Sequence, residues 1–286
     1  MSDDRRAFFR AMVRSAASAA EPLPEEEVVP AAPPGLSDEE IERYSRQLVL
    51  PQWSEAAQLA LRAASVLVVG AGALGSPVAA YLAGAGVGRL GIVDFDAVEL
   101  SNLHRQTLHF TPDLGVPKAE SAAAKLRFLN PGIVVEPYQA RFTPAMLDGA
   151  DLVVDCSDSF ETRYEVNLAC CAARTPLVEG GVVGLSGLVM AIRPGESACY
   201  RCAFPEPPPP GAAPTCAEAG VLGPAAGVIG SLQALEALKL LAGLDGALLD
   251  AFLQVDLYDY AFLRVSVTRR ADCPDCGALT PPRAAH

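Results

Sequence analysis

The sequence predicts an α/β fold in which a Rossmann-like, mostly parallel sheet is followed by a more antiparallel C-terminal part with a four-cysteine zinc site. Three observations lead to this prediction. Apolar, β-branched runs alternate with helical patterns between Ser65 and Gly180, as in parallel sheets covered on both faces. A glycine-rich turn, "GAGALG", joins the first run to a helical pattern. Two C-x-x-C pairs, "CYRC" and "CPDC", lie further along the chain.

Length, charge and cysteine content exclude several classes of protein. The 286 residues are 51% hydrophobic, which allows a sizeable core and excludes a disordered chain. A formal net charge of -12 repels phosphate backbones, so nucleic-acid binding is not expected. No apolar run is long enough to span a membrane, and eight cysteines in so long a chain indicate a reducing compartment. We therefore expect a cytoplasmic protein whose cysteines are thiols or metal ligands.

The first 35 residues are predicted to be an extension of the folded domain. Residues 21–35, "EPLPEEEVVPAAPPG", have the composition of a linker. The pair "RR" before "FF" near the start resembles a twin-arginine export signal, but the segment that follows is short and carries Arg14. A loose or docking extension is therefore favoured over a signal.

The remaining elements are predicted in chain order. A capping box of Ser37 and Glu40 starts a helix that carries Arg43 and Arg46. Strands are expected in the apolar runs beginning at residues 65, 90, 133, 151 and 176, and helices from about residues 76, 118 and 162. Beyond residue 180, "GLVMAIR" and "FLQVDLYDYAFLRVSVTRR" predict antiparallel strands, with a helix over about 227–241 between them. The proline-rich "FPEPPPPGAAP" predicts a mobile crossing loop.

The glycine turn predicts a nucleotide site. Gly70 allows the tight turn, Gly72 lets the backbone approach a phosphate, and Gly75 allows close packing of helix on strand. Asp94 follows Gly75 by about 20 residues and ends the next strand, where a carboxylate binds ribose hydroxyls. This fingerprint indicates an adenosine nucleotide without distinguishing NAD from ATP.

The residues after the second strand favour a triphosphate. The segment "DFDAVELSNLHRQ" places Asn102, Arg105 and Gln106 just beyond that strand, and Lys118 follows. A dehydrogenase site has no general need for these basic residues, whereas a nucleoside triphosphate under attack requires its charge to be neutralised. In so acidic a chain, the group as a whole indicates phosphate chemistry.

Two carboxylates end another strand, in "DLVVDCSDSFETR". Asp155 and Asp158 stand at the expected ligand-bearing edge of the sheet, and a carboxylate there can hold magnesium together with phosphate oxygens. The same residues fit a second interpretation, in which Asp158 or Ser159 caps the following helix. The local sequence leaves both interpretations open.

The cysteines fall into three groups. Two C-x-x-C pairs in a reduced protein predict one tetrahedral, structural zinc site, with these ligands: Cys199, Cys202, Cys273 and Cys276. Cys216 stands apart in "PTCAEAG" and is either an inert residue or a nucleophile beside the proline-rich loop. Cys156, Cys170 and Cys171 lie in apolar contexts and are expected in the core.

Taken in combination, these motifs resemble the ThiF/MoeB family, the bacterial relatives of ubiquitin-activating enzymes. The resemblance runs from about Leu36 to Gly277, and is greatest to the molybdopterin-synthase adenylyltransferase branch. The motifs that carry it are "RYSRQLVLP", "GAGALGSPVAAYLAGAGVG", "DFDAVELSNLHRQ", "GVPKAES", "DCSDS", "CYRC", "TCAEAGVLGPAAGVIGSLQALEALKLLAG" and "CPDC". It implies an adenylation domain over residues 36–277, with a nucleotide-binding half at about 60–180, a zinc and carrier-binding half at about 181–277, and a tail at 278–286.

The resemblance implies a reaction and partners. Enzymes of this family bind ATP and magnesium and adenylate the C-terminal glycine of a ubiquitin-like sulfur-carrier protein that ends in Gly-Gly. Pyrophosphate leaves, and a separate sulfur donor then converts the acyl-adenylate to a thiocarboxylate, for molybdopterin, thiamine or related biosynthesis. The carrier tail would enter under the loop near residues 204–218.

The resemblance also implies a role for each residue that matches a family motif. The nucleotide would contact Gly70, Gly72 and Gly75, with Asp94 on its ribose. The phosphates or the acyl-adenylate would contact Asn102, Arg105, Gln106 and Lys118. Asp158 would serve magnesium and the reacting centre, and Arg46 would be supplied across the interface of a homodimer. The four cysteines of the C-x-x-C pairs match the zinc ligands, and Cys216 matches a thiol whose role varies in the family.

The chain departs from the family pattern in three places. Ser159 replaces the usual asparagine after the second aspartate of "DCSDS", which leaves the contact of that position open. The first 35 residues are an added extension. The sequence ends soon after Cys276, so a fused rhodanese domain that supplies sulfur is not expected.

Two alternative functions remain at this stage. The glycine fingerprint alone fits a NAD-dependent oxidoreductase. A non-catalytic module that binds a ubiquitin-like protein would keep the fold and lose the chemistry. The adenylation hypothesis differs from both in requiring four residues: Arg46, Arg105, Lys118 and Asp158.

Overall fold

The computed structural model describes residues 35–209 and 220–280. The chain divides between residues 35 and 36, and every element described belongs to the second unit, which begins at Leu36. The predicted N-terminal extension, Cys216 and the last six residues of the tail lie outside the described residues.

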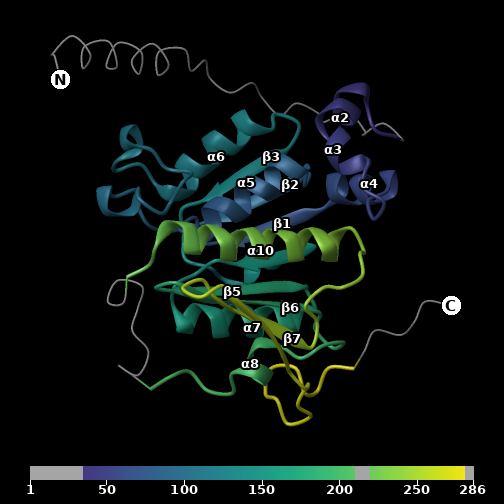
Figure 1. The fold of residues 1–286 in the computed structure, drawn as a ribbon, viewed down its shortest axis with the longest axis vertical. Helices are drawn as coiled ribbons and strands as arrows, with labels where there is room; N and C mark the ends of the chain where they lie inside the picture. Colours follow the sequence, from purple (N-terminus) through teal and green to yellow (C-terminus); the bar gives the residue numbers. More distant parts are fainter. Residues whose placement is uncertain (1–34, 210–219, 281–286) are drawn as a thin grey trace. The chain divides into compact units, whose positions relative to one another are not determined.

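One sheet organises the fold, and its described strands form the order β3-β2-β1-β4-β5-β6-β7-β8 (Figure 1). Neighbouring strands from β3 through β5 are parallel, and those from β5 through β8 are antiparallel. The strands are β1 (Ser65–Val69), β2 (Arg89–Val93), β3 (Val134–Tyr138), β4 (Leu152–Asp155), β5 (Leu177–Val183), β6 (Ser186–Ile192), β7 (Ala251–Asp256) and β8 (Ala261–Ser266). The predicted Rossmann-like sheet with a more antiparallel C-terminal part is confirmed.

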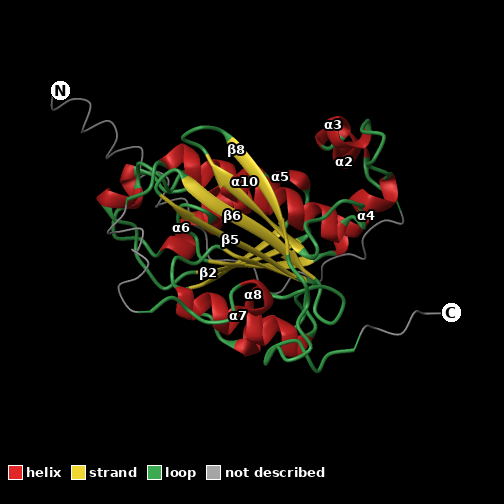
Figure 2. Cartoon of the chain, turned by 60° about the horizontal axis from the view of Figure 1, so that its bottom comes forward, coloured by secondary structure: helices red, strands yellow, loops and turns green. Residues whose placement is uncertain are grey.

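Helices cover both faces of the sheet (Figure 2). The helices are α2 (Asp38–Arg43), α3 (Ser45–Leu48), α4 (Glu55–Ala63), α5 (Gly75–Ala85), α6 (Lys118–Leu129), α7 (Phe160–Ala173), α8 (Tyr200–Ala203) and α10 (Gly223–Leu241). One apolar core lies between the sheet and α5, α6 and α10, and a second lies between the sheet and α7, α8 and the four paired cysteines. The alternation of strands and helices therefore produces two separate cores, one on each face.

The first predicted helix is interrupted. Tyr44 has φ -97° and ψ 9° and separates α2 from α3, so Arg43 ends one helix and Arg46 lies in the next. The reason is packing, because the Tyr44 ring is buried and its hydroxyl accepts a hydrogen bond from Asn130 Nδ2 at 2.9 Å. The Ser37 and Glu40 capping box forms as predicted.

The C-terminal part also refines the prediction. Helix α10 begins at Gly223, one turn before the expected start, with proline in its first turn, where no hydrogen-bond donor is required. The long run after residue 251 forms the β7–β8 hairpin. Residues 204–209 form neither helix nor strand, and the remainder of the predicted mobile loop lies outside the described residues.

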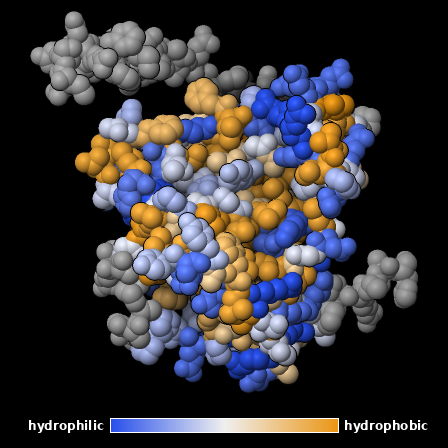
Figure 3. Space-filling view, in the orientation of Figure 1, coloured by the Kyte–Doolittle hydropathy of each residue, from blue (hydrophilic) through white to orange (hydrophobic). Residues whose placement is uncertain are grey.

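The surface around α10 mixes hydrophobic and hydrophilic side chains (Figure 3). Larger apolar side chains are exposed on the edge strand β8, where Phe262 and Leu263 are 52% and 58% exposed, and in the turn before it, at Tyr258 and Tyr260. Among the described residues, no helix combines the length and apolar character needed to cross a membrane.

Candidate functional site

A cavity of about 540 Å³ opens at the carboxyl ends of the parallel strands. Its lining comes from the segments that follow β1, β2, β3 and β4 and from the start of α7. Because β2 and β4 flank β1 on opposite sides, this is the point where the strand order reverses, and open α/β sheets bind ligands there.

The glycine turn forms one wall of the cavity. Gly70 has φ +100°, and a Cβ atom there would lie 2.8 Å from the carbonyl oxygen of Cys156. A Cβ at Gly75 would lie 1.9 Å from the carbonyl oxygen of Gly70, so only glycine lets α5 start this close to β1. Gly72 lines the cavity. The predicted roles of Gly70 in the tight turn and of Gly75 in the packing of helix on strand therefore have a steric basis.

Asp94 is fixed by backbone groups at the end of β2. One carboxylate oxygen accepts from Ala71 N at 2.8 Å and the other from Asp96 N at 2.9 Å. The residue is 9% exposed, and burial raises the pKa of its carboxyl above the ordinary value, although both hydrogen bonds act in the opposite direction. The carboxylate is thus held at the cavity edge in one orientation.

His109 supports the same turn and was not identified from the sequence. Its Nε2 lies 2.8 Å from the carbonyl oxygen of Ala71, and its Nδ1 lies 2.8 Å from Ser121 Oγ. A carbonyl only accepts, so Nε2 carries the proton and Nδ1 is free to accept from the serine hydroxyl. Burial lowers the pKa of this imidazole, which keeps it neutral.

The residues predicted to bind phosphates come from the chain between the end of β2 and the start of α6. Lys118 begins α6, is 6% exposed and pairs with Asp96 at 2.9 Å. Arg105 donates to the carbonyl oxygen of Ser101 at 2.7 Å. Gln106 is buried, and its Oε1 has no hydrogen-bond partner among the described residues. Arg105, Gln106 and Lys118 all line the cavity.

Three predicted site residues do not line the cavity. Gly75 is buried in the turn behind it. Asn102 is also buried and closes a local turn, where its Oδ1 accepts from Glu99 N at 3.3 Å. Arg46 is exposed on α3, away from the cavity of its own chain.

The structure of the segment after β4 distinguishes the two interpretations of this segment, metal binding and helix capping. Ser159 Oγ accepts from Thr162 N at 3.2 Å and caps α7, so the capping role belongs to the serine. Asp158 is exposed and lines the cavity. Asp155 is fully buried and does not line it. Of the two aspartates, Asp158 is therefore the one placed to meet a ligand.

Further lining residues were missed by sequence reasoning. Phe95 and Arg141 face the cavity, with the Arg141 guanidinium 3.9 Å from the centre of the Phe95 ring. Arg141 and Phe142 follow β3, so the rule that ligands meet the carboxyl ends of strands could have found them. Arg163, inside α7, has no comparable sequence signal.

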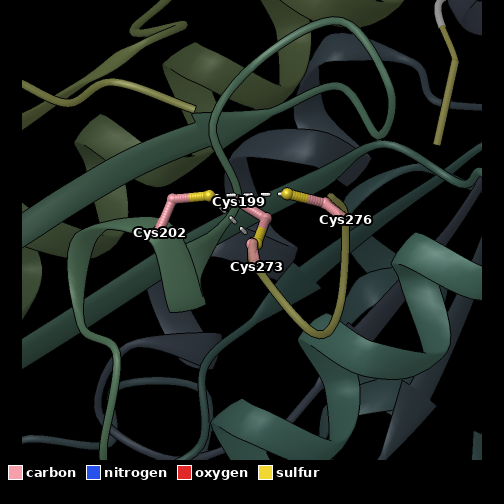
Figure 4. A group of neighbouring side chains, drawn as sticks. All are labelled: Cys199, Cys202, Cys273 and Cys276. Carbon is pink, nitrogen blue, oxygen red and sulfur yellow. Dashed lines mark hydrogen bonds between the residues drawn. The ribbon is translucent and has the colours of Figure 1, made fainter. Parts of the chain in front are cut away.

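The two C-x-x-C pairs meet in the core between the sheet and helices α7 and α8, and Figure 4 shows their four side chains close together. Their four sulfur atoms lie within 4.8 Å of one another, and all four residues are buried. The Sγ–Sγ distances are 3.9 Å for Cys199–Cys202, 3.6 Å for Cys199–Cys273 and 3.4 Å for Cys202–Cys276. Tetrahedral zinc with bonds of about 2.3 Å gives edges of about 3.8 Å, so the four thiols fit such an ion.

Polar contacts hold the two pairs together. Asn167 of α7 accepts from Tyr200 N at 3.0 Å and donates to Asp275 Oδ2 at 2.7 Å. Arg201 Nε lies 2.9 Å from the other oxygen of Asp275. Cys171, also on α7, lies close to Cys199 and, together with burial, raises the pKa of that thiol. As predicted, Cys156, Cys170 and Cys171 are buried in the core.

Fold and cavity define a nucleotide-binding type of α/β protein that carries a separate four-thiol cluster. The chain belongs to the ThiF family, which matches residues 44–276. It is 49% identical over 248 residues to "Sulfur carrier protein adenylyltransferase" of Thermus thermophilus, covering 84% of this chain and 92% of that protein. The resemblance to the ThiF/MoeB family is therefore confirmed.

Other relatives are longer. The chain is 49% identical over 247 residues to "Adenylyltransferase and sulfurtransferase MOCS3" of Sus scrofa, and spans 54% of that protein. Among solved structures, E. coli MccB with ATP has a TM-score of 0.73 at 24% identity, over 82% of this chain and 74% of that one. At that identity the likeness shows a shared fold.

Proposed function

We propose that this chain uses ATP to adenylate the C-terminal glycine of a ubiquitin-like sulfur-carrier protein, for sulfur transfer in molybdopterin, thiamine or related biosynthesis. The observation that carries the proposal is one cavity at the strand-order reversal that joins the glycine turn to Arg105, Lys118 and Asp158. The 49% identity to a sulfur carrier protein adenylyltransferase, over 92% of that protein, supports it.

The chemistry needs charge control more than proton transfer. The carrier carboxylate is already ionised, so its oxygen attacks the α-phosphorus of ATP without a general base. A carboxyl–phosphate bond forms, the bond from the α-phosphorus to the bridging oxygen breaks, and pyrophosphate leaves with the electron pair. Two anions must approach each other, so the site has to orient them and screen their repulsion.

Each residue has a proposed role in that approach. The glycine turn cradles the nucleotide, and Asp94 accepts from the ribose hydroxyls. Lys118 and Arg105 neutralise the phosphates, and Gln106 and Asn102 bind or support the binding of the reacting groups. Asp158 contributes a carboxylate oxygen to magnesium, which would screen the phosphate charge when bound.

The cysteine cluster is proposed to hold zinc in a structural role. Protein thiols fill all four positions of a tetrahedral site, so no position remains open to a substrate. The ion would fasten the segment after residue 270 to the segment around α8. We also propose that residues 36–277 form the adenylation domain.

The proposed assembly has further members. We infer a cytoplasmic homodimer in which Arg46 of one subunit reaches the cavity of its partner, which agrees with its exposed position on α3. The exposed apolar side chains of β8 offer contact area for a protein partner. A separate protein is expected to donate sulfur.

Exchange of labelled pyrophosphate into ATP tests the proposal directly. Exchange should appear when a purified carrier ending in Gly-Gly is added, and disappear when the last glycine is deleted. Cys216 should be dispensable for this step, since adenylation needs no thiol. Absence of exchange with every such carrier, together with tight NAD binding, would overturn the proposal in favour of an oxidoreductase. Carrier binding without exchange would favour a non-catalytic module.

A further inference from the structure

Asn167 occupies a central position between the two C-x-x-C pairs. It is fully buried in the middle of α7, and asparagine is not a usual zinc ligand. Its Oδ1 accepts from the backbone N of Tyr200, next to Cys199, which fixes the orientation of the amide because a backbone N–H only donates. Its Nδ2 therefore donates to Asp275, between Cys273 and Cys276. One amide thus bonds to both cysteine segments.

The same helix reaches the nucleotide cavity one turn earlier. Arg163 lines the cavity and its Nη2 donates to the carbonyl oxygen of Ser157 at 3.0 Å. The next residue is Asp158, the proposed magnesium ligand. Arg163 also lies 3.7 Å from the buried carboxylate of Glu179, in space that Gly181 leaves open.

Besides helix α7 itself, a contact through Tyr200 links the cysteine cluster to the nucleotide cavity. The Arg163 guanidinium interacts electrostatically with Tyr200, whose phenol group helps to raise the pKa of Arg163 and whose backbone N–H binds Asn167, one turn along α7 from Arg163. Tyr200 is 2% exposed and packs edge-on against Tyr164 at 5.3 Å between ring centres. The path from cysteine cluster to cavity is therefore short, buried and polar, running through Asn167, Tyr200 and Arg163.

We propose that Asn167 is a positioning residue: it docks both cysteine segments on α7, and through Tyr200 and Arg163 this docking holds the Ser157–Asp158 loop in place for the nucleotide. The inference rests on the proposed metal and adenylation roles. Partners that lie just behind metal ligands commonly change metal affinity or activity by about 10- to 100-fold when altered.

The polarity of the Asn167–Asp275 pair allows a swap experiment. Asn167→Asp keeps an oxygen that accepts from Tyr200 N. Its other oxygen replaces the donor Nδ2, so two carboxylate oxygens then face each other at Asp275. Asp275→Asn alone leaves one amide oxygen for two donors, Asn167 Nδ2 and Arg201 Nε, so the new NH2 group must oppose one of them. The double variant N167D/D275N restores one hydrogen bond with donor and acceptor exchanged, and keeps a carbonyl oxygen toward Arg201.

Three quantities should be measured on full-length, zinc-loaded protein: zinc release to a chromogenic chelator, the dissociation constant for ATP, and hydrogen exchange of the peptide covering residues 157–162. We expect each single variant to release zinc about 10-fold faster or more, to bind ATP several-fold more weakly and to exchange faster in that peptide. The double variant should return toward wild type in all three.

Tyr200→Phe tests the contact between the cysteine cluster and the nucleotide cavity without altering the cluster. It keeps the inference testable if N167D does not fold. It removes only the hydroxyl contact with Arg163, so zinc release should stay at the wild-type rate while ATP binding weakens and the 157–162 peptide exchanges faster. Asn130→Asp is the matched control, a buried asparagine that binds Tyr44 and Ala83 far from the cluster. It should lower stability without accelerating zinc release.

The outcomes distinguish this inference from the proposed function. Wild-type protein that retains no zinc, or binds no ATP, overturns the proposed function itself. Wild-type protein that does both, with single variants that match it or a double variant no better than the singles, overturns the role of Asn167. Faster zinc release with unchanged ATP binding and exchange would also overturn it, because the amide would then serve the cluster alone.

Discussion

The two sites of this protein are built in opposite ways. The nucleotide cavity is assembled from short segments that each follow a strand, and its polar residues remain accessible to a ligand. The cysteine cluster joins two segments far apart in the sequence, and its four thiols are buried with no solvent-facing position. The first arrangement suits a substrate that enters and leaves, and the second suits an ion that stays.

The two sites also differ in how the surrounding structure holds them in place. The cavity is held by strand register, since Val69 pairs with Val93 on one side and with Asp155 on the other. The cluster joins the segment after β8 to the segment around α8, and α7 holds the same segment through Asn167 and its C-cap Arg174. Loss of a cavity residue should therefore affect chemistry, whereas loss of a cluster residue should affect folding.

The largest effect is expected from Cys273→Ser. Removing one thiolate leaves three ligands and detaches the C-terminal segment, so the protein should lose about one equivalent of zinc per chain and much of its folding stability, because binding energy of a structural zinc is folding energy. Metal analysis and chemical denaturation measure both. Cys170→Ala is the control, a buried cysteine of α7 outside the cluster, which should keep its zinc. A C273S protein with wild-type stability and full zinc would contradict the structural role.

Lys118→Ala tests the cavity side of the comparison. Removing this cation from the phosphates should lower pyrophosphate exchange by about 100-fold or more, as expected for a preorganised charge-stabilising group. The melting temperature should change little, because Asp96 is 49% exposed and solvates readily when its partner is lost. Lys125→Ala is the matched control on the same helix: Lys125 pairs with Asp113 and does not line the cavity. Equal rates in the two variants would remove Lys118 from the site.

The sequence predicts the cavity well because its residues are local. Gly70, Gly72 and Asp94 each follow an apolar strand, and parallel strands bring such positions to one edge. His109 and Arg163 were missed for the opposite reason, since each contacts a residue distant in the sequence, Ala71 and Glu179 respectively. Asn102, which its motif position groups with the residues proposed to bind phosphates, closes a turn and does not line the cavity.

The sequence predicts which four cysteines come together, but not which residues surround them. Thiol spacing specifies a tetrahedral site, because few other structures need two C-x-x-C pairs. Spacing says nothing of Asn167 or Asp275, whose importance depends on how α7 packs across the cluster. The break at Tyr44 was missed similarly, because tertiary packing of the ring overrides a continuous helical pattern.

A smaller effect is expected from His109→Gln, on the pH dependence of folding stability. Burial lowers its pKa, so as pH falls below the ordinary histidine value of 6.5 the unfolded chain binds a proton before the folded chain does. Stability from neutral His109 is therefore fully present above pH 6.5 and is lost as pH falls through the lowered pKa. Denaturation at pH 7.5 and 5.5 should show a fall for wild type and a smaller fall for His109→Gln. His104→Gln, at an exposed position, should keep the wild-type fall, and identical pH dependence in H109Q would contradict the assignment.

The smallest expected effect is the loss of stability in Ser159→Ala, and comparing this variant with Asp158→Asn distinguishes the roles of the two neighbours. Ser159→Ala removes the cap that accepts from Thr162 N, which should lower the free energy of unfolding by about 1 kcal/mol and leave exchange nearly unchanged. Asp158→Asn should do the reverse, since this exposed side chain stabilises no described contact yet faces the cavity. Melting curves and exchange rates for the two variants measure the contrast. If S159A reduces exchange as strongly as D158N, the serine is itself part of the nucleotide site, and α7 contributes its cap as well as Arg163 to the chemistry.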